Sequence, residues 1–122
     1  MKSLAGGLVG LVALLHVYFL ILEMFLWTKP YGRRVFSLTP EKAALTRSLA
    51  ANQGLYNGFL AAGLGWGLLA GTDGYTIKGF FLSCVIVAGV FGAATVGRKI
   101  LWAQAVPGAF ALAAVCAANA QP

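Results

Sequence analysis

The chain has 122 residues, of which 60% are hydrophobic and only 10% charged, and its mean hydropathy is +0.83. Soluble domains carry about 25% charged residues, because their surfaces face water. The composition therefore excludes an ordinary soluble protein and predicts one small integral membrane domain over residues 1–122. The net charge of +6 suits anionic lipid headgroups, and no basic run is interleaved with stacking aromatics in a water-exposed segment. We therefore expect membrane lipid, and not nucleic acid, as the partner.

Four apolar segments approach the length of about 20 residues that a membrane-spanning helix needs. They cover residues 4–27, 49–69, 79–96 and 100–118. The first is too long for a signal peptide and lacks a small-residue cleavage site, so we expect a retained helix. Only three residues separate the last two segments, which predicts a tight antiparallel hairpin. The pattern predicts an all-α, four-helix up-and-down bundle with a long basic loop over residues 28–48.

Basic residues in the short loops predict the orientation of these helices, because they accumulate on the cytoplasmic side. Lys2 and Lys78 fall on one side of the membrane. Seven basic residues fall on the other side: Lys29, Arg33, Arg34, Lys42, Arg47, Arg98 and Lys99. We therefore expect the side with seven basic residues to be cytoplasmic and both chain termini to lie outside.

The connection between the first two segments contains two recognisable stretches. In SLTPEKAAL, Thr39 can cap a helix that has Pro40 at its first position and Glu41 in its first turn, so the second helix should begin near Pro40. Before it, KPYGRRVF is basic and aromatic. This stretch is either an interfacial anchor or a clamp in which Arg33 and Arg34 hold an anionic headgroup.

Polar side chains gather at one predicted depth. His16 and Glu23 are seven residues apart and fall about 20° from each other on a helix. The second and fourth segments bring further polar groups to the depth of Glu23: Asn52, Gln53, Tyr56, Asn57 and Gln104. Facing lipid would cost an ionisable group about 2.5–3.5 kcal/mol at the helix centre, so these groups should face inward. They are then either glue between helices or the lining of a cavity open toward the cytoplasmic leaflet; we favour the cavity.

Small residues recur on the second helix at Gly54, Gly58, Ala61 and Gly65, on the face expected to lie opposite the amides. Such faces permit close helix contact and leave open a homodimer through a glycine-rich face that the bundle does not use.

Cys84 and Cys116 lie in apolar segments, and the chain has a single histidine. No zinc site is therefore expected, and no cofactor is implied.

The motifs EMFLWT, GRRVF, LTPEKA and LAANQGLYNGFLAAGLGWG follow one another along the chain. This combination resembles a family of small bacterial four-helix membrane proteins grouped as a domain of unknown function. The resemblance covers essentially the whole chain and implies a single-domain protein of the bacterial inner membrane. Some family members are labelled epimerases, but no dinucleotide fingerprint or sugar-nucleotide site is present, so that activity is not carried over. The likeness to membrane proteins of the DoxX type is one of architecture alone.

Three functions compete. The first is a site that binds, and could isomerise, a lipid or small amphipathic molecule, with Glu23 and His16 as proton carriers and the amides orienting the ligand. Glu23 and His16 lie about 10 Å apart along the helix axis, so a ligand would have to bridge them. The second is a proton-coupled transporter, since small multidrug transporters have similar length and one membrane carboxylate. The third is an accessory or structural subunit of a membrane complex. The sequence leaves open whether the protein is an enzyme.

Overall fold

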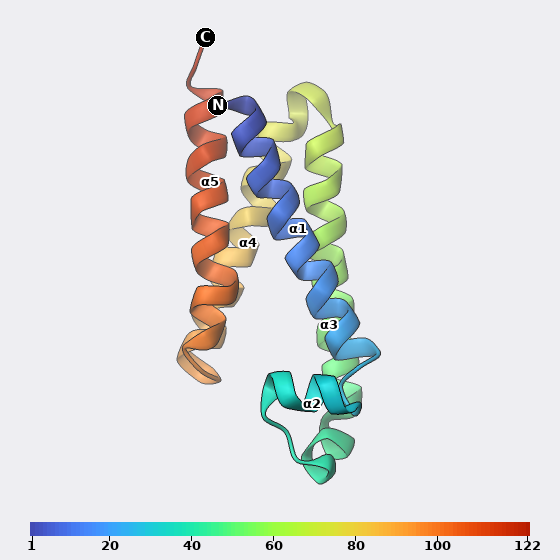
Figure 1. The fold of residues 1–122 in the computed structure, drawn as a ribbon. Coiled ribbons are helices and arrows are strands. Elements are labelled where there is room, and N and C mark those ends of the chain that lie inside the picture. Colours follow the sequence, from blue (N-terminus) through green and yellow to red (C-terminus); the bar gives the residue numbers. More distant parts are fainter. The chain divides into compact units, whose positions relative to one another are not determined.

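The structure is a computed structural model that describes all 122 residues, and it consists of helices joined by short turns (Figure 1). In chain order these are α1 (Lys2–Met24), α2 (Pro30–Phe36), α3 (Pro40–Leu69), the 3-10 helix η1 (Gly71–Asp73), α4 (Gly74–Thr95), the π-helix η2 (Leu101–Ala105) and α5 (Val106–Asn119). No strand is present, which confirms the all-α prediction.

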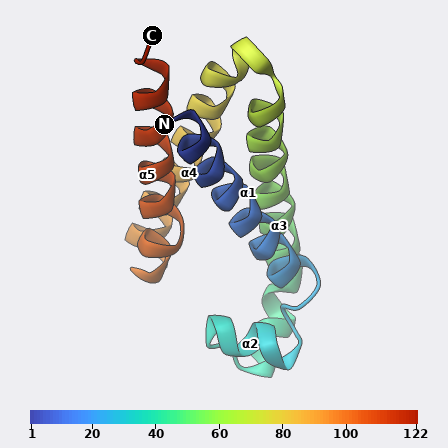
Figure 2. The same cartoon turned by 45° about the horizontal axis from the view of Figure 1, so that its top comes forward.

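Residues 1–14 and 60–122 form the first of two units, and residues 15–59 form the second. α1 and α3 each contribute one part to each unit. In the first unit, the start of α1 and the end of α3 pack with α4 and α5, and the N- and C-termini lie close together (Figure 2). The core consists of small and branched apolar side chains that are almost wholly buried: Val9, Val12, Leu64, Leu82, Val85 and Ala111.

Three helical segments are long and apolar enough to cross a membrane: Lys2–Met24, Gly71–Thr95 and Leu101–Asn119. Large apolar side chains such as Leu14, Leu69 and Phe91 are exposed along these and other helices, as expected for surfaces that face lipid. The length and composition of these helices indicate a membrane protein. α3 is the longest helix, at 30 residues, but it is not one of these three membrane-spanning candidates. The side-chain amides of Asn52, Gln53 and Asn57 lower its mean hydropathy. The fourth crossing, and with it the four-helix bundle, stays a prediction.

Several connections differ from the sequence-based expectation. The predicted loop over residues 28–48 contains α2, because Pro30 presets the first helical turn and Arg33 and Arg34 suit the negative end of the helix. Ser37 ends α2 in the left-handed conformation (φ 54°). α3 begins at Pro40 as predicted, and the backbone N–H of Lys42 donates to Thr39 Oγ1 at 3.2 Å.

The other helix ends also shift. α1 ends at Met24, three residues before the predicted end, and α4 begins at Gly74, five residues before the predicted start at residue 79. Gly71 (φ +61°) takes a left-handed conformation two residues after the end of α3, and it is the first residue of η1. The π-helix η2 precedes Pro107, whose missing N–H leaves the carbonyl of Ala103 without its usual α-helical donor.

Candidate functional site

His16 and Glu23 lie on a buried stripe of α1. His16 is fully buried and Glu23 is 9% exposed, and both belong to the second unit. The His16 ring meets the edge of Phe19 with 5.4 Å between centroids. The prediction that the two polar residues share an inward-facing stripe is confirmed.

Glu23 forms a buried hydrogen bond with α3. Nδ2 of Asn57 donates to Oε1 of Glu23 at 2.5 Å, and Asn57 is only 7% exposed. This bond satisfies one carboxyl oxygen and joins residues that are 34 positions apart in the chain. A polar pair that crosses two helices can act as glue, and the second carboxyl oxygen remains an acceptor for another donor.

Gly54 explains how α1 comes close enough for this bond. A Cβ at Gly54 would lie 2.6 Å from Met24 Cγ, 3.1 Å from Glu23 Cβ and 3.2 Å from the carbonyl oxygen of Leu20. Gly54 is three residues before Asn57, about 60° away on the helix. The expectation that glycines and amides occupy opposite faces is therefore wrong for Asn57, which shares the close-packed face with Gly54.

The other three residues of α3 that were predicted to line the site do not join this contact. Asn52 and Gln53 are exposed, and Tyr56 is 52% exposed. The expectation that all four face inward is wrong, because the stripe of α3 that packs inward repeats at Ala43, Ala50, Gly54 and Asn57. On a helix, Asn52 and Tyr56 fall about 140° and 100° from Asn57, so they leave this stripe. Their role in ligand binding stays a prediction.

Gln104 belongs to the first unit, where it lies half-buried in η2. π-helical turns are rare in proteins, and those that do occur often lie at functional sites. The π-helix was not predicted, although Pro107 was a signal for irregular backbone hydrogen bonding before it. The assignment of Gln104 to the same site as Glu23 stays a prediction.

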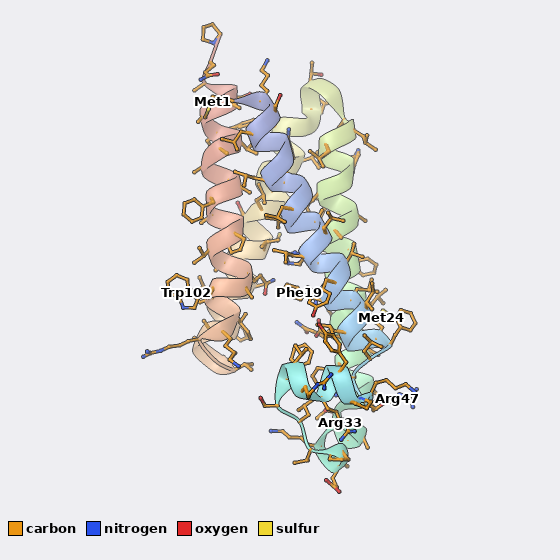
Figure 3. All side chains as sticks on the ribbon, in the orientation of Figure 1. Met1, Phe19, Met24, Arg33, Arg47 and Trp102 are labelled. Atoms are coloured by element: carbon orange, nitrogen blue, oxygen red, sulfur yellow. The ribbon has the colours of Figure 1, made fainter.

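Aromatic side chains tie α2 to α1 directly and to α3 through Trp27, which lies in the connection between α1 and α2. The hydroxyls of Tyr18 on α1 and Tyr31 on α2 are hydrogen-bonded at 2.5 Å. Trp27 stacks at a tilt on Phe36, with 4.7 Å between centroids. Nε1 of Trp27 also donates to Oγ1 of Thr46 on α3 at 2.9 Å. Figure 3 draws these side chains and labels Met24 at the end of α1 and Arg33 on α2.

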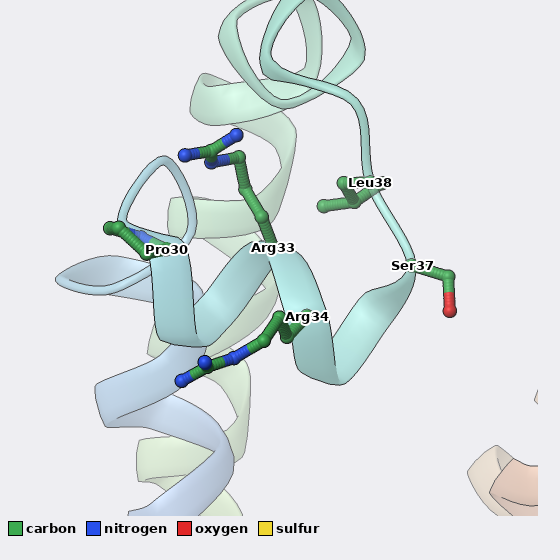
Figure 4. Close-up of a pocket in the computed structure, with 5 residues that line it drawn as sticks. All are labelled: Pro30, Arg33, Arg34, Ser37 and Leu38. Atoms are coloured by element: carbon green, nitrogen blue, oxygen red, sulfur yellow. The ribbon is translucent and has the colours of Figure 1, made fainter.

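An open cavity of 380 Å³ lies against α2, lined by Pro30, Arg33, Arg34, Ser37 and Leu38 (Figure 4). The Nε atom of Arg33 is buried and has no hydrogen-bond partner. The two arginines are consecutive, so their side chains leave α2 in different directions (Figure 4). The predicted two-armed clamp therefore becomes one partly buried guanidinium, that of Arg33, beside a second and more exposed one.

These groups offer anion recognition more readily than proton transfer. A guanidinium has five donors and suits carboxylate or phosphate oxygens. Glu23 is already hydrogen-bonded to Asn57, and His16 packs on Phe19. No group of three His, Cys, Asp or Glu side chains that could hold a metal ion occurs in the chain. Cys84 and Cys116 are free thiols.

Comparison with known proteins agrees with the resemblance that the motifs indicated. The sequence profile of a family described as "Protein of unknown function (DUF1304)" matches residues 10–116. The chain is similar to the uncharacterized protein YpaA of Lactococcus lactis subsp. lactis (strain IL1403), with 30% identity over 96 residues. The alignment covers 77% of this chain and 81% of that relative. No solved structure matches the chain.

Proposed function

The chain belongs to the DUF1304 family, and we propose that it is an inner-membrane protein that binds an anionic amphipathic molecule at the cavity against α2. The observation that carries the proposal is Arg33, which lines that cavity and whose buried Nε has no hydrogen-bond partner. A buried donor without an acceptor costs about 1–3 kcal/mol, and an anionic headgroup would supply the acceptor. Phospholipids offer such a group at the membrane surface.

The surroundings of α2 support this location. Tyr31, Trp27 and Phe36 are amphipathic or apolar rings of the kind that gather at membrane–water interfaces. Arg34 adds a second positive charge to the cavity lining. In this proposal the Glu23–Asn57 bond holds α1 against α3 and thereby fixes the helix to which α2 is tied through Tyr18. Isomerisation has less support, because Glu23 and His16 are engaged with protein groups.

The test replaces Arg33 by methionine, which keeps an apolar stem and removes the guanidinium. We expect the purified full chain to bind phosphatidylglycerol at least about tenfold more weakly, as measured by native mass spectrometry, since a hydrogen bond to a charged group contributes about 1.5–3 kcal/mol. Arg98→Met is the matched control and should bind as the wild type does, because Arg98 is exposed in a turn of the first unit. Equal binding by wild type and Arg33→Met would overturn the proposal.

A second candidate is an accessory subunit of a membrane complex. The observation in its favour is that Asn52, Gln53 and Tyr56 are exposed on α3. Amide side chains hydrogen-bond across helices, so a partner helix could satisfy them in the membrane. The partner could be a second copy of the chain, since Gly7, Gly10 and Gly65 also have open space around them. Cross-linking of an Asn52→Cys variant in native membranes distinguishes a second copy from a different protein by mass.

The proposed topology has four crossings, with both termini outside and residues 28–48 in the cytoplasm. Single cysteines introduced at Ser37, Thr72 and Gly97 into a Cys84→Ala/Cys116→Ala chain test it. We expect a membrane-impermeant thiol reagent added to intact cells to label position 72 and to spare positions 37 and 97, because the basic loops stay inside. If α3 does not cross, position 97 is labelled and position 72 is spared.

A further inference from the structure

A second cavity, of 580 Å³, lies in the first unit where the start of α1, the α3–α4 connection and the end of α5 meet. It is separate from the cavity against α2, which belongs to the second unit. Five polar side chains line it: Lys2, Thr72, Tyr75, Lys78 and Asn119. None of the sequence motifs pointed to this set, because its members come from three distant parts of the chain.

Lys78 is held in place by two glycines. A Cβ at Gly67 would lie 2.6 Å from Lys78 Cγ, and a Cβ at Gly74 would lie 3.8 Å from Lys78 Cε. The aliphatic stem of Lys78 therefore runs along backbone from which side chains are missing, and the residue is half-buried. A lysine stem ordered in this way has lost part of its conformational freedom before a ligand arrives, which favours binding.

The charge of the lining is positive. Lys2 and Lys78 supply two ammonium groups, and no carboxylate is among the lining residues. The hydroxyl of Thr72 and the amide of Asn119 are further donors. Lys2 and Ala5 belong to the first turn of α1, and Tyr75 belongs to that of α4, so two positive helix ends lie at the same space. Tyr75 contacts α5 through a 3.9 Å hydrogen bond to Cys116 Sγ.

We propose that this cavity binds a phosphate group through Lys2 and Lys78, with Thr72 and Asn119 as additional donors. A phosphate can come from a phospholipid headgroup or from a soluble phosphate compound, and both present the same oxygens. The cavity lies at helix ends, which is the depth of headgroups if these helices cross the bilayer. Two anion sites would then lie in different units of the chain, one near Arg33 and one between Lys2 and Lys78.

The experiment compares the wild-type full chain with Lys2→Met/Lys78→Met in a neutral detergent. Methionine keeps the stem of Lys78 against Gly67 while removing the charge. Two probes separate the sources of phosphate. Phosphatidylglycerol binding is followed by native mass spectrometry, and inorganic phosphate is titrated while the thermal unfolding midpoint is recorded. Lys99→Met, which removes an exposed lysine just before η2, is the control.

We expect the double variant to lose one of two bound phosphatidylglycerol molecules, because the affinity of that site falls at least about tenfold, while the site near Arg33 and the Lys99→Met control bind as in the wild type. Protection by inorganic phosphate that the double variant loses would identify a soluble anion as a sufficient ligand. Loss of lipid binding alone would identify the headgroup. The double variant must keep the wild-type helical circular dichroism, which shows that it folds. Wild-type affinity for both probes in a folded double variant would overturn the proposal, whatever the outcome at Arg33.

Discussion

Replacing Asn57 by leucine should lower the free energy of unfolding by about 1–3 kcal/mol, because it leaves the buried carboxyl group of Glu23 without its donor. The hydrogen bond is 2.5 Å long and both partners are less than a tenth exposed, so water cannot readily replace the amide. The measurement is unfolding of the purified protein by increasing sodium dodecyl sulfate in mixed micelles, followed by circular dichroism.

Two further variants show whether the pair itself is responsible. Asn52→Leu makes the same chemical change on the same helix at an exposed position, and we expect it to alter stability little. Glu23→Leu/Asn57→Leu removes both polar partners, and it should recover much of the stability lost in Asn57→Leu, since replacing both partners by apolar groups can be nearly neutral. A double variant as unstable as the sum of its single variants would contradict the coupling of Glu23 to Asn57.

The stripe of α1 could be predicted from sequence because it depends on one helix alone. Seven residues separate His16 from Glu23, and this spacing places them on one face whatever surrounds the helix. The partner of Glu23 could not be selected in the same way. Asn52, Gln53 and Asn57 are chemically equivalent candidates, and the choice depends on where α1 approaches α3, which Gly54 decides by leaving room for the backbone of α1.

The fold shows the same difference between features that local sequence determines and features that depend on contacts between helices. Thr39 and Pro40 are local signals, and α3 begins where they predict. The start of α4 depends instead on Gly71, the first residue of η1, whose positive φ redirects the chain after α3. α2 was predicted as loop because its composition is that of an interfacial segment. Its position depends on contacts from Tyr18 and Trp27, which lie 13 and 9 residues from their partners Tyr31 and Phe36.

Of the two proposed anion sites, the sequence offered the first as a clamp of Arg33 and Arg34 and did not point to the second. Arg33 was a candidate because it stands in a basic run, but the run does not reveal which guanidinium becomes buried. Lys2 and Lys78 are isolated charges, 76 residues apart, and each alone is typical of a lysine at a membrane surface. Only the packing of α1, α4 and α5 brings them to one cavity.

Replacing Gly89 by alanine should destabilise the first unit by about 1–3 kcal/mol, the usual cost of overpacking a close contact. A Cβ at this position of α4 would lie 2.6 Å from the backbone nitrogen of Ala105 and 2.9 Å from its Cα. Backbone atoms cannot rotate away as a side chain can, so α4 and the π-helix η2 must separate. Because η2 leads directly into α5, the separation would also loosen the contact of α4 with α5.

Gly79→Ala is the matched control, since it makes the same change on the same helix where no atom lies within 4 Å of the added Cβ. There the substitution should be neutral or stabilising by up to about 1 kcal/mol, because alanine loses less backbone entropy in a helix than glycine does. The two variants are compared by the same detergent unfolding titration. If Gly89→Ala were as stable as Gly79→Ala, α4 and η2 could not be packed backbone to backbone, and the hairpin that the three-residue connection predicts would have to be held by other contacts.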